Sequence, residues 1–205
     1  MHQEAITSRA KRIFNKLRYF SDFYLAGGTG LALQLGHRIS IDFDLFWEKY
    51  IPKDLLEKVR KVFKNAKIKV VVNHSEQLTV TISGINLTFA RYPFPVISKF
   101  INYQGIRILP ALEIATMKAY ALGRRATLKD YVDLYFVLKE KVGTLEKIIT
   151  ISKKKYGKDF DPRLFLEQLI YSKDIEDIEI QFLKEKVNKL KIEKFFEKEI
   201  KKIKI

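Results

Sequence analysis

Cysteine is absent from the 205 residues of this sequence, and histidine is scarce. Without cysteine the chain can form no disulfide, has no thiolate nucleophile and offers no thiolate ligand to zinc. The three histidines, His2, His37 and His74, lie far apart in the sequence, which argues against an imidazole metal site. These absences exclude disulfide-stabilised, cysteine-dependent and zinc-thiolate proteins.

Long apolar runs are also missing. No stretch approaches the ~20 apolar residues that a membrane-spanning helix needs. The first residues, MHQEAITSRAKRIF, lack the apolar segment of a secretory signal peptide. We therefore expect a cytoplasmic protein with no membrane partner, and the apolar fraction of 47% is ample for a packed core.

The formal net charge of +15 is large and unevenly distributed. Residues 1–138 hold 21 lysines and arginines against 11 acidic residues, whereas residues 139–205 hold 18 against 13. This distribution favours a polyanionic partner such as RNA. The alternative is a lysine-rich surface of the kind found in heat-adapted proteins, in which lysine only solvates the surface.

Residues 25–47, LAGGTGLALQLGHRISIDFDLFW, carry the strongest functional signal. The tripeptide Gly27-Gly28-Thr29 follows a short apolar run at residues 23–26 and opens a second one. This order predicts a strand, a tight turn and the start of a helix. Glycines let a ligand approach the backbone closely, and the first N–H groups of a helix favour phosphate.

The end of this stretch, IDFDLFW, alternates between apolar and acidic side chains. The alternation predicts a strand in which Asp42 and Asp44 leave one face, with Cα atoms roughly 6–7 Å apart, while Ile41, Phe43 and Leu45 point to the other. Mg²⁺ in proteins is usually held by one or two carboxylates together with substrate phosphates. A glycine turn followed by paired carboxylates therefore predicts metal-dependent phosphoryl chemistry.

These residues resemble the Gly-Gly/Ser … Asp-x-Asp signature of the polymerase-beta-like nucleotidyltransferases. The longer string GGTGLALQLGHRISIDFDLF is similar, more specifically, to the AbiEii/AbiGii toxin type of that superfamily. Further matches to that type are Gly36-His37-Arg38, Ser40, Met117-Lys118 and the segment KDYVDL at residues 129–134. The resemblance covers about residues 24–138.

The resemblance implies a fold, a reaction and a set of partners. The fold is α+β, with a mixed, largely antiparallel sheet flanked by helices in a polymerase-beta-type nucleotidyltransferase core, followed by a C-terminal helical bundle. The reaction is transfer of an NMP from an NTP to an acceptor hydroxyl, with RNA (the tRNA 3′ end) as acceptor and Mg²⁺ or Mn²⁺ as cofactor. A cognate antitoxin is a further implied partner, because this type acts as the toxin of toxin–antitoxin or abortive-infection pairs.

The resemblance also implies a role for each site residue. It assigns metal binding to Asp42 and Asp44, and contact with the triphosphate oxygens to Lys118. It assigns positioning of that lysine, or activation of the nucleophile, to Asp130 or Asp133. Phosphate or nucleotide binding is assigned to Gly27, Gly28, Thr29, Arg38 and Ser40. The residues alone leave alternatives open. Arg38 could pair with a neighbouring carboxylate, His37 and Ser40 could form turns, Lys118 could reach solvent, and Asp130 suits a helix N-terminus.

One part of the wider superfamily pattern is missing. Many nucleotidyltransferases carry a third carboxylate on a later strand, but residues 77–108 contain no Asp or Glu. A site in this chain therefore uses two acids or completes its metal shell from elsewhere. The resemblance to the AbiEii type implies that the later Lys and Asp motif completes the site.

Hydrophobic periodicity predicts the remaining elements. We expect helices over residues 4–20, 30–35, 110–122, 128–140, 145–156, 163–171 and 180–204, a helix beginning near Pro52, strands over 23–26, 41–47, 68–73, 77–83, 87–91 and 106–109, and a basic loop over 123–127. We expect two domains, a nucleotidyltransferase sheet domain over residues 1–109 and a helical domain over residues 110–205 that carries the later Lys and Asp motifs.

Two other functions stay open. The same catalytic unit could act on a small molecule or a protein hydroxyl, or the chain could be a non-catalytic nucleotide- or RNA-binding module on a degenerate scaffold. The sequence contains no G-x-S-x-G, H-E-x-x-H or G-x-x-x-x-G-K-[ST] motif, which disfavours hydrolase, zincin and P-loop chemistry.

Overall fold

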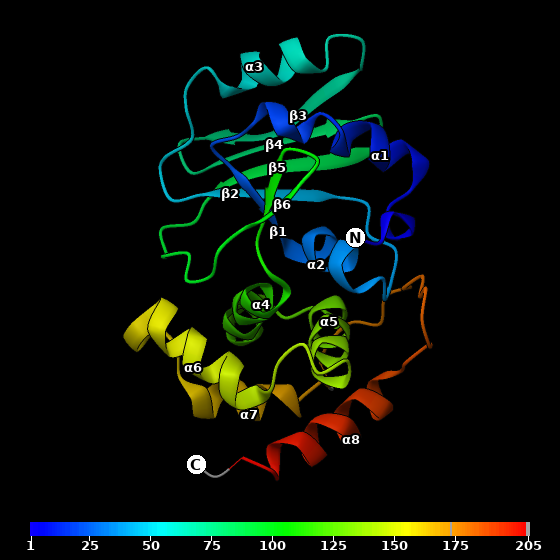
Figure 1. The fold of residues 1–205 in the computed structure, drawn as a ribbon, viewed down its shortest axis with the longest axis vertical. Helices are drawn as coiled ribbons and strands as arrows, with labels where there is room; N and C mark the ends of the chain where they lie inside the picture. The colour runs from blue at the N-terminus through cyan, green and yellow to red at the C-terminus, as the bar shows by residue number, and fades with distance from the viewer. Residues whose placement is uncertain (173, 204–205) are drawn as a thin grey trace.

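A mixed β-sheet forms the upper half of the molecule, and most of the helices lie below it (Figure 1). The computed structural model describes residues 1–172 and 174–203. Within these residues the sheet has seven strands in the order β3-β4-β5-β2-β1-β7-β6. The strands are β1 (Tyr24–Ala26), β2 (Phe43–Trp47), β3 (Ile68–His74), β4 (Gln77–Ile82), β5 (Ile85–Arg91), β6 (Ile101–Tyr103) and β7 (Ile106–Ile108).

The helices divide between the two faces of the sheet. In Figure 1, α3 lies above β3 and α1 lies at the level of β3 to β5 toward the right, whereas α2 and the later helices lie below the strands. The helices are α1 (Ser8–Phe14), α2 (Gly27–Leu35), α3 (Leu55–Val62), α4 (Ala111–Arg125), α5 (Leu128–Lys139), α6 (Leu145–Tyr156), α7 (Pro162–Leu169) and α8 (Lys189–Ile200). None of those in the described part of the chain combines the length and apolar character that a membrane crossing requires.

The central strand β2 positions the acidic motif. It pairs antiparallel with β1, with Asp44 opposite Ala26, and parallel with β5, with Asp44 opposite Thr88. Because Gly27 directly follows Ala26, the β1–β2 register brings the glycine turn beside Asp44. Most strand pairings are antiparallel, and only β1–β7 and β2–β5 are parallel. The expected α+β class with a mixed, largely antiparallel sheet is confirmed.

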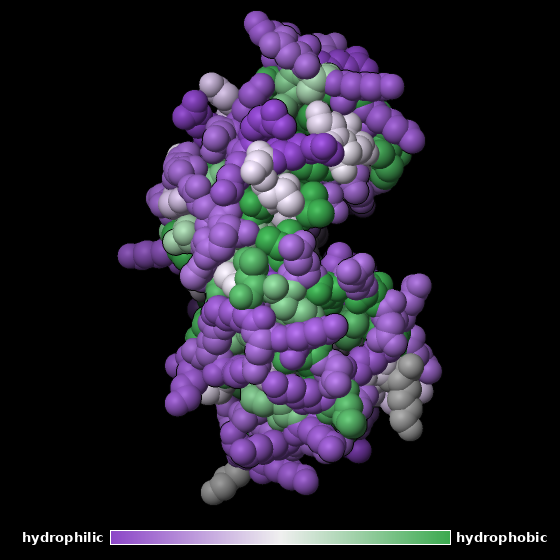
Figure 2. Space-filling model, turned by 90° about the vertical axis from the view of Figure 1, so that its right-hand side faces the viewer, coloured by the Kyte–Doolittle hydropathy of each residue, from purple (hydrophilic) through white to green (hydrophobic). Residues whose placement is uncertain are grey.

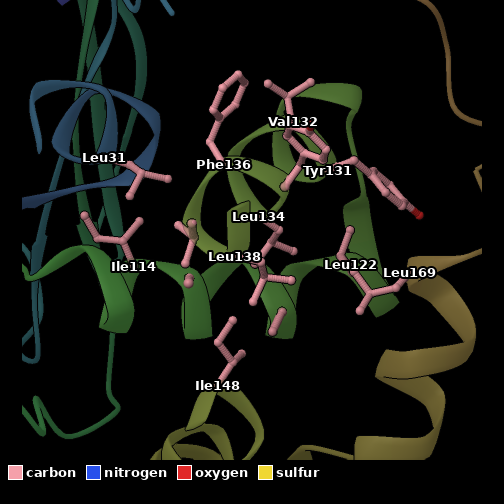
Figure 3. Close-up of a cluster of buried hydrophobic side chains, with 14 of the residues drawn as sticks. Leu31, Ile114, Leu122, Tyr131, Val132, Leu134, Phe136, Leu138, Ile148 and Leu169 are labelled. Carbon is pink, nitrogen blue, oxygen red and sulfur yellow. The ribbon is translucent and has the colours of Figure 1, made fainter. Parts of the chain in front are cut away.

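Two apolar clusters pack on the two faces of the sheet. The upper one joins the sheet to α1 and α3 and includes the buried side chains of Phe14, Phe43 and Val59. The lower one joins the sheet to α2 and the C-terminal helices. Figure 3 shows Leu31 of α2 and Ile114 of α4 facing each other at this junction. The lower cluster therefore crosses the boundary at residue 109, and the division into two domains stays a prediction.

Helix α5 lies at the centre of the lower layer. Every residue from Asp130 to Leu138 is buried, which requires partners on all sides of the helix. Neighbouring helices α4 and α8 supply part of this cover. The position of α5 explains why two acids of the predicted site, Asp130 and Asp133, lie inside the protein.

Several predicted element boundaries are wrong. The helix expected over residues 4–20 is split, because the Thr7 side chain accepts the N–H of Ala10 and begins α1 anew after a short 3₁₀ turn. The strand expected over residues 41–47 begins only at Phe43, which leaves Ile41 exposed. Helix α4 continues through most of the expected basic loop.

The C-terminal region differs most from expectation. The helix expected over residues 180–204 begins at Lys189 and ends at Ile200, and Lys204 lies outside the described residues. Residues 179–188 are extended or bent instead. Strand β6 is an addition that the sequence did not predict, whereas α6 has the expected bounds.

A buried ion pair anchors the chain after β5 to the helical layer. The Glu113 carboxylate of α4 accepts the N–H groups of Ile97 at 2.9 Å and Ser98 at 2.8 Å, and it pairs with Lys155 of α6 at 2.7 Å. Both charged side chains are fully buried. Burial acts to raise the pKa of Glu113, but the hydrogen bonds from Lys155 and the two backbone N–H groups outweigh it and hold that pKa below its usual range.

We expect Glu113→Gln to lower the free energy of unfolding by about 3–5 kcal/mol, because it leaves the buried Lys155 ammonium without a counter-charge. Urea unfolding at neutral pH measures the loss. The exposed pair between Arg163 and Glu167 provides the control, and Glu167→Gln should change the stability little. Similar losses in both variants would contradict the assignment.

Candidate functional site

A cleft of about 650 Å³ opens where β2 and β5 face α2, α4 and α5. Every predicted site residue except Asp133 lines it. The predicted residues on its wall are Gly27, Gly28, Thr29, Arg38, Ser40, Asp42, Asp44, Lys118 and Asp130. These residues come from four separate parts of the chain, so the fold brings the early and the late motifs together. The outline of the space-filling view is indented between the upper and lower parts of the molecule (Figure 2).

The glycine turn is shaped for close approach. Gly27 has a φ of +63°, and a Cβ at this position would lie 2.4 Å from Oδ2 of Asp44. A Cβ on Gly28 would lie 2.6 Å from Nη2 of Arg38. Only glycine fits both positions without displacing these side chains. Helix α2 begins at Gly27, so its first N–H groups and the Arg38 guanidinium lie together at the cleft and favour an anion.

The two acids of the Asp-x-Asp motif both line the cleft but differ in environment. Asp44 lies on β2 and is mostly buried, and this burial raises its pKa, with the neighbouring Asp42 adding to the rise and Lys118 opposing it. Asp42 lies just before the strand and is exposed. Its Oδ1 accepts the N–H of Asn86 at 2.8 Å. A partly buried carboxylate whose charge is poorly compensated is a suitable ligand for a cation.

Thr29 and Ser40 connect the glycine turn to the acidic motif. The Thr29 hydroxyl is buried and donates to Oγ of Ser40 at 2.7 Å, and it also lies within hydrogen-bonding reach of the Asp42 carbonyl. These contacts hold the segment before β2 against the start of α2. Ser40 therefore has a hydrogen-bonding role at the cleft beyond forming a turn.

Asp133 lies behind the cleft and forms ion pairs with two cationic side chains of the site, Arg38 and Lys118. Its carboxylate accepts hydrogen bonds from Arg38, from Nε at 2.7 Å and from Nη2 at 2.9 Å. It also lies 2.7 Å from Nζ of Lys118 and 2.6 Å from Nε2 of His37. Asp133 and His37 are fully buried. Burial acts to raise the pKa of Asp133, but Arg38 and Lys118 outweigh it and hold that pKa well below its usual range.

Asp130 lies one turn earlier on α5, at the wall of the cleft. Its Oδ1 accepts Nζ of Lys118 at 2.8 Å, and its Oδ2 accepts the N–H and hydroxyl of Thr127 at 3.0 and 2.9 Å. Burial acts to lower the pKa of Lys118, but Asp133 and Asp130 outweigh it and raise that pKa. Lys118 is therefore a buried ammonium held at the cleft by two carboxylates, and it does not extend into solvent.

Other residues of the cleft wall were not predicted as site residues. They include Phe46, Gln77, Thr88, Met117, Arg125, Thr127, Lys129 and residues 179–181. The sequence offered a signal for four of them, because Arg125 and Thr127 belong to the expected basic loop, and Met117 and Lys129 to the later motifs. It offered none for residues 179–181, which reach the cleft only through the tertiary fold.

The donor set fits a divalent cation bound together with a nucleotide. Within the described residues no group of three or more His, Asp or Glu side chains could hold a metal ion. The position opposite Asp44 on β5 is Thr88, so the neighbouring strand adds no third carboxylate. Asp42 and Asp44 leave coordination positions for phosphate oxygens and water, which is the usual arrangement for Mg²⁺.

We expect Asp133→Asn to lower the free energy of unfolding by about 3–5 kcal/mol at pH 7, because Arg38 and Lys118 then stay buried with too little negative charge. The pKa of Asp133 is depressed in the folded state, so its contribution is present above its unfolded pKa of about 3.9 and is lost as the pH falls toward the lower folded value.

Denaturant unfolding of the wild type and the variant between pH 3 and 8 measures this prediction. The difference in stability should be constant above about pH 5 and shrink in acid. Asp54→Asn, at an exposed position, is the control and should behave like the wild type. A stability difference that grows in acid would contradict the assigned role of Asp133.

Comparison with known proteins gives a family match. The family model for "Nucleotidyl transferase AbiEii toxin, Type IV TA system" matches residues 11–204. The uncharacterized protein aq_aa25 of Aquifex aeolicus (strain VF5) is 32% identical over 188 residues, which cover 88% of this chain and 87% of that protein.

Two solved structures share the fold. The nucleotidyltransferase toxin MenT4 of Mycobacterium tuberculosis superimposes with a TM-score of 0.59 at 17% identity, over 92% of this chain and 82% of that one. JHP933 of Helicobacter pylori superimposes with a TM-score of 0.53 at 18% identity, over 96% of both chains. The resemblance noted over residues 24–138 is confirmed, and the family match extends it through the helical region. This chain belongs to the AbiEii family of nucleotidyltransferase toxins.

Proposed function

We propose that this nucleotidyltransferase uses Mg²⁺ to transfer an NMP from an NTP to the 3′ end of an RNA, with tRNA as the acceptor. The observation that carries the proposal is the shared cleft, where a glycine turn, two carboxylates and several cationic side chains meet. Nucleotidyltransferases of this kind use an NTP and a divalent metal. The choice of Mg²⁺ is supported by the two-carboxylate donor set, which Mn²⁺ can also use.

Each group of the cleft has a distinct task in this reaction. The N-terminus of α2 and Arg38 bind phosphate oxygens beside Gly28, and Lys118 binds the β- or γ-phosphate. Asp42 and Asp44 would hold the cation, which supplies charge neutralisation at the phosphates. The acceptor oxygen bonds to the α-phosphorus, the bond to the bridging α–β oxygen breaks, and pyrophosphate leaves. The acceptor proton passes to a carboxylate at the cleft or to water.

Asp130 and Asp133 take different parts in this scheme. Asp133 is fully buried and engaged by several donors, so we assign it to holding Arg38 and Lys118. Asp130 reaches the cleft wall and directs the Lys118 ammonium toward the nucleotide. Because both carboxylates are engaged by these donors, we assign the cation to the Asp-x-Asp pair.

The charge of the protein favours RNA over a small cationic acceptor. The formal net charge is +15, and residues 1–138, which contain most of the cleft wall, carry the larger part of the excess. Arg125 and Lys129 lie on the cleft wall in addition to the predicted cations. A polyanion is attracted to such a surface. We further propose that modification of tRNA is the toxic activity that a cognate antitoxin counteracts, as the family description implies a toxin–antitoxin pair.

We expect Asp44→Asn to reduce transfer at least about a hundredfold while leaving the metal-free protein at least as stable as the wild type. Because the pKa of Asp44 is raised in the folded state, its charge costs stability at neutral pH, and an uncharged amide removes that cost. Thermal unfolding and a radiolabel transfer assay measure the two effects.

Mg²⁺ with NTP should raise the melting temperature of the wild type but not that of Asp44→Asn. Asp22→Asn, at an exposed position before β1, is the matched control and should retain both activity and the thermal shift. Full transfer by a folded Asp44→Asn protein would refute the assignment.

A second assay identifies the acceptor. The four α-³²P-labelled NTPs are each incubated with Mg²⁺, the protein and total tRNA, with one sample of tRNA oxidised by periodate to destroy its 3′ diol. We expect label to enter intact tRNA and not oxidised tRNA. Label in a protein, in a small molecule or equally in both tRNA samples would contradict a 3′-end acceptor.

A further inference from the structure

The chain between α7 and α8 reaches the active site although no sequence signal marks it. Residues 179–184, here called the strap, run beside residues 37–39, and Figure 1 shows this orange segment rising on the right toward α2. The N–H of Ile39 donates to the carbonyl of Gln181 at 2.8 Å. The first three strap residues also line the cleft. The strap is therefore both a wall of the site and a backbone partner of the segment that carries Arg38.

His37 is the residue at which the strap meets the buried charges. Its carbonyl accepts the N–H groups of Leu183 at 3.0 Å and Lys184 at 3.3 Å. The next residue, Arg38, forms an antiparallel bridge with Phe182. The main chain around His37 is thus held by backbone hydrogen bonds from a segment far away in the sequence.

The His37 side chain points into the lower core toward α5. Its ring is fully buried, packs against Phe136 with ring centroids 5.1 Å apart, and places Nε2 2.6 Å from Oδ1 of Asp133. Because Asp133 is ionised, Nε2 carries the hydrogen and donates it. Nδ1 has no hydrogen-bond partner in the described part of the chain, so the bond to Asp133 is the polar contact that orients the ring.

The Asp133 carboxylate needs this donor because its oxygens are shared. Oδ1 accepts from both His37 and Nε of Arg38, while Oδ2 accepts from Nη2 of Arg38 and pairs with Lys118. The rotation of this carboxylate therefore sets where the guanidinium and the ammonium lie. A carboxylate that lost the His37 contact could turn and move both cations away from the nucleotide, since buried ion pairs depend on exact donor geometry.

We propose that His37 is a positioning residue for NTP binding and that the strap keeps it in place. The strap fixes the main chain of His37, His37 orients Asp133, and Asp133 aims Arg38 and Lys118 at the phosphates. This inference rests on the proposed binding of an NTP in the cleft, but not on the identity of the acceptor. It gives a function to the non-helical segment between α7 and α8.

The test compares His37→Gln with His37→Leu. Glutamine can place an amide N–H near the position of Nε2, whereas leucine keeps bulk and removes the donor. Binding of α,β-methylene analogues of the four NTPs is measured with Mg²⁺ and without acceptor, alongside KM and kcat for transfer. We expect His37→Leu to weaken NTP binding and raise the NTP KM about tenfold, corresponding to one lost hydrogen bond. His37→Gln should recover binding to within about threefold, and kcat should change less than KM.

A merely structural role predicts a different result. In that case both variants would lose stability and activity together, with no rescue by glutamine, and this outcome would overturn the proposal. Unchanged NTP binding in His37→Leu would also overturn it. If the unaltered protein bound none of the analogues, the proposed function itself would fail, and this inference with it.

The strap provides an independent arm that does not alter His37. Leu183→Pro removes one of the two N–H groups that donate to the His37 carbonyl. Lys186→Pro is the control, at an exposed position whose N–H has no backbone acceptor among the described residues. We expect the first variant alone to weaken NTP binding several-fold. Equal affinity in the two proline variants would refute the role of the strap.

Discussion

The buried carboxylate of Asp133 is the interaction on which the site depends. A fully buried negative charge is costly unless donors surround it, and here Arg38, Lys118 and His37 provide them. The same contacts draw two cations to the wall of the cleft. The donors that compensate the buried Asp133 charge are thus the same cations that the cleft places beside its proposed ligand. An ion-pair cluster of this kind gives geometric definition more than net stability.

The local parts of the site could be predicted from the sequence. A glycine pair before an apolar run and acids that alternate with apolar residues are short-range patterns, so the glycine turn and the position of Asp44 beside it follow from them. The start of β2 could not be predicted in this way, because it depends on where β1 and β5 stop pairing with that strand. For this reason Asp42 lies before the strand and Ile41 is exposed, contrary to the simple alternation.

The long-range parts could not be predicted from pattern alone. Asp130 and Asp133 are three residues apart on one helix, and only the packing of α5 against residues 37–38 decides which acid faces the cleft and which lies behind it. The mixed polar and apolar sequence of residues 180–204 predicted a helix beginning at residue 180. Its backbone instead bonds to the main chain of residues 37–39, a tertiary interaction that overrides the local preference for helix. The fold class was easier to predict, because it needs only the order and type of the elements.

The position of the strap has a consequence for the order in which the protein becomes active. A ribosome releases the glycine turn and the acidic pair first, then the helices α4 to α7, and the strap after them. Until the strap emerges, the backbone groups of residues 37–39 lack their partners and one wall of the cleft is missing. The site is therefore incomplete until the strap has been synthesised and has packed against residues 37–39.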